Sequence, residues 1–237
     1  MSAYILKSKI DLILLDSVMF EDYLEQSFEE LRFDINQRPP SSRRSNDYSK
    51  KIKELIKEKT KDKTFLFIGE VKIDIEWFVH PQLRFETAST PDVDNIIKPI
   101  IDGLCGPDSI LVDDCQVQSV SCSWIDTTDY DQSFSCTVEP HFIDDRFNKA
   151  GLKFVNIKSD LCFPINENEE NEFIEDTLKV CLRGINYKEK ISKEINDYFF
   201  ASMKMPLLKF FHKERLGRFE VENMSDFCQR KKIDCPL

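Results

Sequence analysis

The segment from Phe65 to Val79 has the clearest alternation of apolar and polar side chains in the chain. Apolar residues or glycine fill every odd position, while Lys72, Asp74 and Glu76 fall on even ones. Successive side chains of a β-strand point to opposite faces, so this period of two predicts a strand with one buried and one solvated face. A polar loop from Gln82 to Thr90 is expected to follow it.

Helical spacing begins just after that loop. With about 100° between successive residues, Asp94, Lys98 and Asp102 fall on one face of a helix. Five branched apolar residues fall on the other side: Ile96, Ile97, Ile100, Ile101 and Leu104. Asp92 precedes the first turn, where a carboxylate can cap amide groups and interact favourably with the helix dipole. The pattern predicts an amphipathic helix with one packed face and one charged face.

Pro99 and the nearby glycines limit where this helix can run. Proline inside a helix removes a hydrogen bond and clashes with the preceding turn, so the helix either kinks at Pro99 or begins later. Gly103 and the pair Gly106-Pro107 are expected to end it.

Two further apolar segments predict strands after the acidic pair Asp113-Asp114. Val117 to Trp124 is the first and Phe134 to Val138 the second, and the polar residues 126–132 between them predict a hairpin loop. A helix among such strands makes an α+β unit, with a small, mainly antiparallel sheet and flanking helices.

A basic segment precedes the alternating strand. Between Arg38 and Lys63 the chain has ten basic residues against four acidic ones. Residues 48–62 have helical spacing, so we expect a basic amphipathic helix. Such a helix is either a solvated surface element or an arm that contacts nucleic-acid phosphates. In the second interpretation the candidate DNA contacts are Arg38, Arg43, Arg44, Lys50, Lys51, Lys53 and Lys57.

The two ends of the chain predict additional elements. Tyr4 to Asp16 is expected to form a strand, Ser17 to Leu31 a helix, and Asn36 to Asn46 a loop around a proline pair. After Pro140 the spacing becomes helical, which predicts a mostly helical C-terminal extension. The expected division is therefore a core of residues 1–145 and an extension of residues 146–237.

Composition narrows the function classes. The 237-residue chain has a formal net charge of -10, which argues against coating nucleic acid through the overall field. A local DNA site stays open, because exposed charges more than about 8 Å apart are screened at physiological salt. The chain has no apolar run of the roughly 18–20 residues that span a membrane and no secretory signal at its start. We therefore expect a cytoplasmic protein.

The eight cysteines are spread along the chain without any Cys-x-x-Cys pair. That spacing does not match a zinc site, and free cysteine in a reducing compartment packs as a small apolar residue. We expect these thiols to be structural.

The acidic residues around the central helix can meet only if something offsets their repulsion. Two like charges about 4 Å apart near a protein surface cost about 4 kcal/mol, whereas an Asp94/Lys98 pair returns only about 0.5 kcal/mol. Either Asp92, Asp94 and one of Asp113 and Asp114 stay apart, or a divalent cation joins them. Oxygen-only ligands suit Mg²⁺ or Mn²⁺, which polarise a phosphodiester and activate water. Lys98 can then neutralise charge that develops on the phosphate.

Other interpretations of these acids fit less well. An EF-hand loop needs an oxygen ligand and a glycine where Ile96 and Ile97 stand. A phosphatase Asp-x-Asp normally follows a buried strand, but Ser89-Thr90-Pro91 precedes Asp92. A single Asp-x-Asp is usually a pair of solvated surface acids, so the joint arrangement with Lys98 is what favours chemistry.

The combined pattern resembles a known family. Asp92-x-Asp94-Asn95-x-x-Lys98, then Asp102-x-Leu104, then Asp113-Asp114-x-Gln116-Val117 resembles the RusA-type Holliday-junction resolvases, endodeoxyribonucleases common in bacteria and their phages. The resemblance is tight from Glu70 to Trp124 and looser back through residues 36–45. It implies a homodimer with a RusA-like mixed α/β core that uses Mg²⁺ to cut branched DNA during recombination, repair or phage DNA processing.

The resemblance also implies residue roles. Asp92, Asp94 and Asp114 are expected to be catalytic metal ligands, with Asp113 as a further candidate ligand, and Lys98 is expected to be the catalytic lysine.

Two other function classes remain as alternatives to the nuclease. One is a non-catalytic DNA- or partner-binding protein that keeps the fold and uses its C-terminal helices as interaction surface. The other is a metal-dependent nucleotide phosphohydrolase, which would release phosphate from small substrates with little salt dependence.

Overall fold

The computed structural model describes residues 46–87, 92–130, 133–142, 145–203 and 209–236. The chain divides into two compact units, and among the described residues the boundary falls between Phe147 and Asn148. We call the described residues up to Phe147 the core unit and those from Asn148 the C-terminal unit. The strand expected at residues 4–16, the helix at 17–31 and the loop at 36–45 lie outside the described residues.

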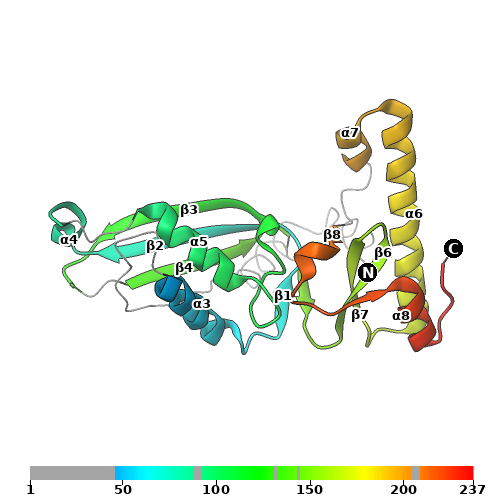
Figure 1. Ribbon diagram of the computed structural model, residues 1–237, viewed down its shortest axis with the longest axis horizontal. Coiled ribbons are helices and arrows are strands. Elements are labelled where there is room, and N and C mark those ends of the chain that lie inside the picture. The colour runs from blue at the N-terminus through cyan, green and yellow to red at the C-terminus, as the bar shows by residue number, and fades with distance from the viewer. Residues whose placement is uncertain (1–45, 88–91, 131–132, 143–144, 204–208, 237) are drawn as a thin grey trace, which may run out of the picture. The chain divides into compact units, whose positions relative to one another are not determined.

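The core unit combines helices with short strands (Figure 1). Its elements, in chain order, are α3 (Asn46–Thr60), β1 (Phe65–Phe67), β2 (Val71–Val79), α4 (Pro81–Phe85), α5 (Val93–Leu104), the 3-10 turn η1 (Asp114–Gln116), β3 (Val117–Asp126), β4 (Ser133–Pro140) and β5 (Arg146–Asn148). This composition confirms the predicted α+β class. One expectation was wrong: the segment read as a polar loop after β2 begins with the short helix α4.

The main sheet has the order β3-β2-β4. β3 runs parallel to β2, with Val71 opposite Val117 and Trp77 opposite Trp124, and β4 runs antiparallel to β2. The predicted hairpin between β3 and β4 is therefore wrong. α5 carries the chain back across the sheet before β3 begins, so β3 starts at the same end of the sheet as β2 and pairs with it in parallel. β4 then pairs with the other side of β2 rather than with β3.

The alternating segment forms two strands rather than one. Along β2 the odd positions are buried, as predicted. The break lies at Gly69, where a Cβ atom would overlap the Asp145 carboxylate, and the Ile68 amide donates to the Asp145 carbonyl. This close approach lets the chain leave the main sheet, and β1 pairs instead with β5.

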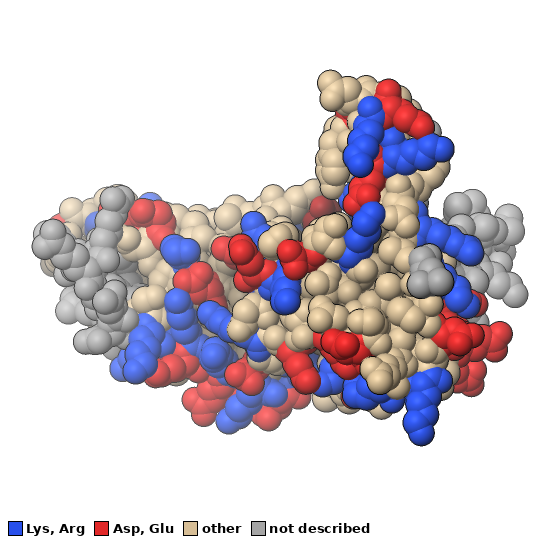
Figure 2. Space-filling view, turned by 45° about the vertical axis from the view of Figure 1, so that its right-hand side comes forward, with Lys and Arg blue, Asp and Glu red and all other residues tan. Residues whose placement is uncertain are grey.

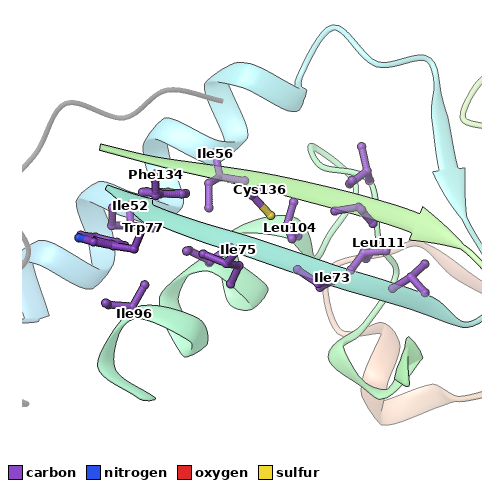
Figure 3. Packing of buried hydrophobic residues seen from close by; sticks show 14 of the residues in the cluster. Ile52, Ile56, Ile73, Ile75, Trp77, Ile96, Leu104, Leu111, Phe134 and Cys136 are labelled. Atoms are coloured by element: carbon purple, nitrogen blue, oxygen red, sulfur yellow. The ribbon is translucent and has the colours of Figure 1, made fainter. Parts of the chain in front are cut away.

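α3 and α5 cover the same face of the main sheet (Figure 3). Ile52 and Ile56 of α3 and Ile96 and Leu104 of α5 point toward the buried side chains of β2 and β4. The two helices pack closely at Gly103, where an added Cβ would lie 3.1 Å from the Ile56 side chain. α5 ends at Leu104, between Gly103 and Gly106, as expected, and Gly103 in its last turn also leaves room for α3. Pro99 is also accommodated inside α5, which ends at Leu104.

The C-terminal unit contains the expected helices and a sheet that the sequence did not reveal. Its elements are β6 (Leu152–Lys158), β7 (Leu161–Asn166), α6 (Asn171–Ile195), α7 (Tyr198–Met203), β8 (Phe211–His212), η3 (Lys213–Leu216), β9 (Val221–Asn223) and α8 (Met224–Lys231). The strands form a sheet in the order β8-β7-β6-β9. Two of these strands have only two or three residues, which is too short for alternation to show in the sequence.

Candidate active site

The charged face of α5 is exposed, as the helical spacing predicted. Asp94 and Lys98 are exposed and Asp102 is half-buried. The Asp102 carboxylate forms ion pairs with two lysines, with Nζ of Lys53 at 2.8 Å and Nζ of Lys98 at 3.5 Å. Lys98 therefore pairs with Asp102, one turn toward the C-terminal end of the helix. The pair considered from the sequence was Asp94 with Lys98. With 76% of the Lys98 side chain exposed, this pair contributes at most about 1 kcal/mol, so Lys98 can exchange partners.

Asp92 lies immediately before α5 and is exposed. Its carbonyl accepts from the Asn95 amide, but its side chain makes no capping hydrogen bond. The expectation that the Asp92 carboxylate caps the helix was therefore wrong. Both Asp92 and Asp94 hold their carboxylates at the exposed N-terminal end of α5.

Asp113 and Asp114 occupy a tightly built turn before β3. The Asp113 carboxylate accepts from the Cys115 amide at 3.2 Å and caps η1, whereas Asp114 is the exposed first residue of that turn. The two neighbouring acids thus have different surroundings, because one oxygen of Asp113 is committed to the backbone.

Gln116 holds this turn in place, and sequence reasoning did not assign it a role. Its side chain is buried and makes four hydrogen bonds to backbone groups. Its Oε1 accepts from the amides of Val112 (2.7 Å) and Asp113 (3.0 Å). Its Nε2 donates to the carbonyls of Phe67 (2.7 Å) and Gly69 (2.8 Å). The signal was present, because Asp113-x-x-Gln116 is a capping box.

The two acidic groups lie at opposite ends of α5. Asp92 and Asp94 are at its N-terminal end, while the Leu104 carbonyl at its C-terminal end accepts from the amides of Ile110 and Leu111, just before Asp113. At a rise of 1.5 Å per residue, the ten steps from Asp94 to Leu104 span about 15 Å. Among the described residues, no group of three or more His, Cys, Asp or Glu side chains is arranged to hold a metal ion. Within one chain, the predicted metal ligands are therefore not gathered at one point: Asp92 and Asp94 lie at one end of α5, and Asp113 and Asp114 at the other.

The predicted DNA-contacting lysines line α3, next to this face. Lys50 and Lys51 are exposed, and Lys57 lies 3.9 Å from Asp108. Lys53 joins α3 to α5 through its pair with Asp102. Figure 2 shows Lys and Arg interspersed with Asp and Glu on the visible face of the protein. The remaining candidates, Arg38, Arg43 and Arg44, lie outside the described residues.

The cysteines are free thiols. Cys136 and Cys181 are buried, and this burial raises the pKa of each thiol to about 12. They stay protonated at neutral pH and pack with the apolar residues around them, as the sequence predicted.

A family match indicates the class of protein to which part of the chain is similar. Residues 35–139 match the family described as endodeoxyribonuclease RusA, and this stretch contains every predicted catalytic residue. The match indicates an endodeoxyribonuclease. Over residues 35–139 the chain is thus similar to the RusA family, which confirms the resemblance. No curated protein sequence matches the chain. In the part of the chain that the structure describes, no helix is long and apolar enough to cross a membrane.

Proposed function

We propose that the protein is a Mg²⁺-dependent endodeoxyribonuclease that acts as a homodimer on branched DNA. The observation that carries the proposal is the set of exposed carboxylates on α5 and η1, within the stretch that matches the RusA family. Their oxygen-only chemistry fits Mg²⁺, with Mn²⁺ as a substitute. The function would serve recombination, repair or phage DNA processing.

In the proposed site Asp92, Asp94 and Asp114 hold the metal ion. Asp114 is preferred over Asp113 because Asp113 already accepts the η1 capping hydrogen bond. The bound ion supplies polarisation of a DNA phosphate and activation of water. Lys98, which exchanges its weak pair with Asp102 for the phosphate, neutralises charge that develops on the phosphate oxygens.

The separation of the acids supports the homodimer. Within one chain, Asp94 lies about 15 Å along α5 from Leu104, whose carbonyl accepts from amides just before the turn that carries Asp114. A second chain in the opposite orientation brings its own Asp114 toward the first chain's Asp92 and Asp94. Two such sites, related by a two-fold axis, would also cut two equivalent strands of a symmetric junction.

A cleavage panel tests this proposal. Purified protein is incubated with four-way junction, fork, flap and linear duplex DNA, with Mg²⁺, with Mn²⁺ and with EDTA. We expect paired nicks in the junction that need a divalent ion and are absent in EDTA. Intact branched DNA under all metal conditions would exclude the proposed activity, and release of phosphate from nucleotides alone would favour a phosphohydrolase.

Removing charge from α3 should weaken DNA binding. When Lys50, Lys51 and Lys57 are changed to alanine, we expect a weaker and less salt-dependent affinity for junction DNA. The slope of log affinity against log salt falls in size by about 0.9 for each lost phosphate contact. The measurement is a salt titration of DNA binding by fluorescence anisotropy, in Ca²⁺ to prevent cleavage.

A matched control distinguishes α3 from the C-terminal unit. Lys188, Lys190 and Lys193 on α6 are replaced by alanine, which removes the same charge. If this variant loses the salt dependence while the α3 variant keeps it, DNA is bound through the C-terminal helices instead.

A further inference from the structure

The chain reverses direction after α8, at a left-handed helix end. Lys232 has a φ of 56°, and its amide donates to the carbonyls of Cys228 and Gln229. The Ile233 amide also donates to the Cys228 carbonyl, at 3.1 Å. Such bonds are typical of a helix that ends in a left-handed residue. They turn the chain back along the helix that it has just left.

Two further contacts hold the reversed segment against the C-terminal unit. The Asp234 amide donates to Oε1 of Glu175 on α6 at 3.2 Å. Ile233 packs against the buried cluster that contains Cys228. The chain therefore runs beside α6 after it leaves α8 (Figure 1). This path determines where the next residue, Cys235, lies.

The reversal brings together two thiols that differ in accessibility. The side chains of Cys228 and Cys235 are hydrogen-bonded to each other. Cys228 on α8 is 2% exposed, whereas Cys235 is an exposed residue. One sulfur is thus open to solvent, and the sulfur that it contacts belongs to the core of the C-terminal unit.

We propose that Cys228 and Cys235 are a reversible disulfide site, which closes by exchange with small disulfides such as oxidised glutathione. A disulfide needs two Cβ atoms about 3.5–4.5 Å apart. Two cysteine side chains that are already hydrogen-bonded through their sulfurs need little movement to reach that spacing. The bond would close a ring over the reversed end of α8.

The reaction consists of two exchanges. The Cys235 thiol loses its proton, and its sulfur attacks one sulfur of oxidised glutathione, which breaks the glutathione disulfide and releases one glutathione. The Cys228 thiol then loses its proton and attacks the Cys235 sulfur, which releases the second glutathione. The protein loses two electrons and two protons in all, and the two glutathione thiols take them up.

The surroundings of the two thiols set the order of these exchanges. Burial, more than the hydrogen bond with Cys235, raises the pKa of the Cys228 thiol to about 12. Cys228 is therefore protonated at neutral pH and is not the group that attacks first, because the thiolate is the nucleophile. Cys235 is exposed, so dissolved glutathione can reach it. Exchange starts at Cys235 and ends at Cys228.

A metal ion is the other partner that two neighbouring thiols could hold. Structural zinc takes four protein ligands and catalytic zinc takes three. Among the residues that the structure describes, no group of three or more His, Cys, Asp or Glu side chains is arranged to hold a metal ion. The pair therefore offers two sulfur ligands alone, which favours a disulfide over a zinc site.

Peptide mapping tests the proposal. The full-length protein is incubated with oxidised glutathione at mildly alkaline pH, and the remaining thiols are alkylated. Trypsin then cuts after the basic residues 230–232, which lie between the two cysteines. We expect residues 219–230 to be recovered linked to residues 233–237, and the link to disappear with dithiothreitol. Separate peptides, with glutathione retained on Cys235, would overturn the proposal.

Three variants test the order of the exchanges. Cys235→Ser should leave Cys228 unmodified, and Cys228→Ala should stop with glutathione on Cys235. Cys115→Ser, at the other exposed cysteine, is the matched control and should form the same link as the wild type. Glutathione on Cys228 in the Cys235→Ser protein would overturn the assigned roles. Thermal unfolding of the reduced variants checks that each one folds.

The same measurement on the wild type shows whether the bond fits the folded protein. Closing the ring of eight residues restricts the unfolded chain, so oxidation should raise the unfolding temperature by about 5 °C. Cys235→Ser should unfold at one temperature with and without glutathione treatment. An unchanged or lower temperature for the oxidised wild type would overturn the proposal, because the bond would then form only in unfolded or distorted protein.

Discussion

Asp94→Asn is expected to lower the rate of junction cleavage about 10³-fold. The substitution keeps the size of the side chain but weakens its hold on the metal ion, and a loss of about 4 kcal/mol of transition-state stabilisation corresponds to this factor. Because Asp94 is exposed, the thermal unfolding temperature should change little. Single-turnover cleavage of a labelled junction measures the effect. Asp108→Asn, at a carboxylate 73% exposed on the same unit, is the control and should cleave at the wild-type rate.

Mixing two inactive variants separates a shared site from a site within one chain. Asp94→Asn and Asp114→Asn are each expected to be inactive as homodimers. In a mixed dimer with shared sites, one site carries both substitutions and the other carries neither. We therefore expect the mixture to regain nicking of one strand of the junction. If each site lay within one chain, every site in the mixture would carry a substitution and cleavage would not return.

Gln116→Met should have the largest effect on stability. It keeps the length of the side chain but leaves four backbone groups, three of them in buried hydrogen bonds, without their partner, and each such buried group costs about 1–3 kcal/mol. We expect the core unit to lose at least about 3 kcal/mol of unfolding free energy, measured by urea denaturation. Gln118→Met, at an exposed position two residues on, is the control.

The same substitution should also lower cleavage, because the turn that presents Asp114 loses its anchor. Cleavage is compared at a temperature where the variant is still folded. A variant that is as stable as the wild type would show that the turn holds its shape without Gln116.

The sequence predicted the elements with a regular period. β2 was visible because its odd positions are all buried, and α5 was visible because its branched residues fill one face. The relation between strands was not visible. A hairpin and a crossover contain the same strand residues, so β3 was placed beside β4 rather than beside β2.

The pattern of apolar and polar residues also could not predict individual contacts between distant residues. Gly103 reads as a helix end from its residue type, and α5 ends one residue later, but the pattern does not show that Gly103 also makes room for α3. Gln116 stood inside the motif, yet its hydrogen bonds reach Phe67 and Gly69, almost fifty residues earlier. Alternation and spacing report on neighbours in the chain and carry no information about such distant partners.

The carboxylate of Asp102 connects α3, the helix proposed to contact DNA, with Lys98, the proposed catalytic lysine. It holds Lys53 and Lys98 at once, so it keeps one cation when it gives up the other. If Lys98 moves to a phosphate, the Asp102 carboxylate is still paired with Lys53. The proposed phosphate contacts of Lys53 and Lys98 therefore compete with the same carboxylate, that of Asp102.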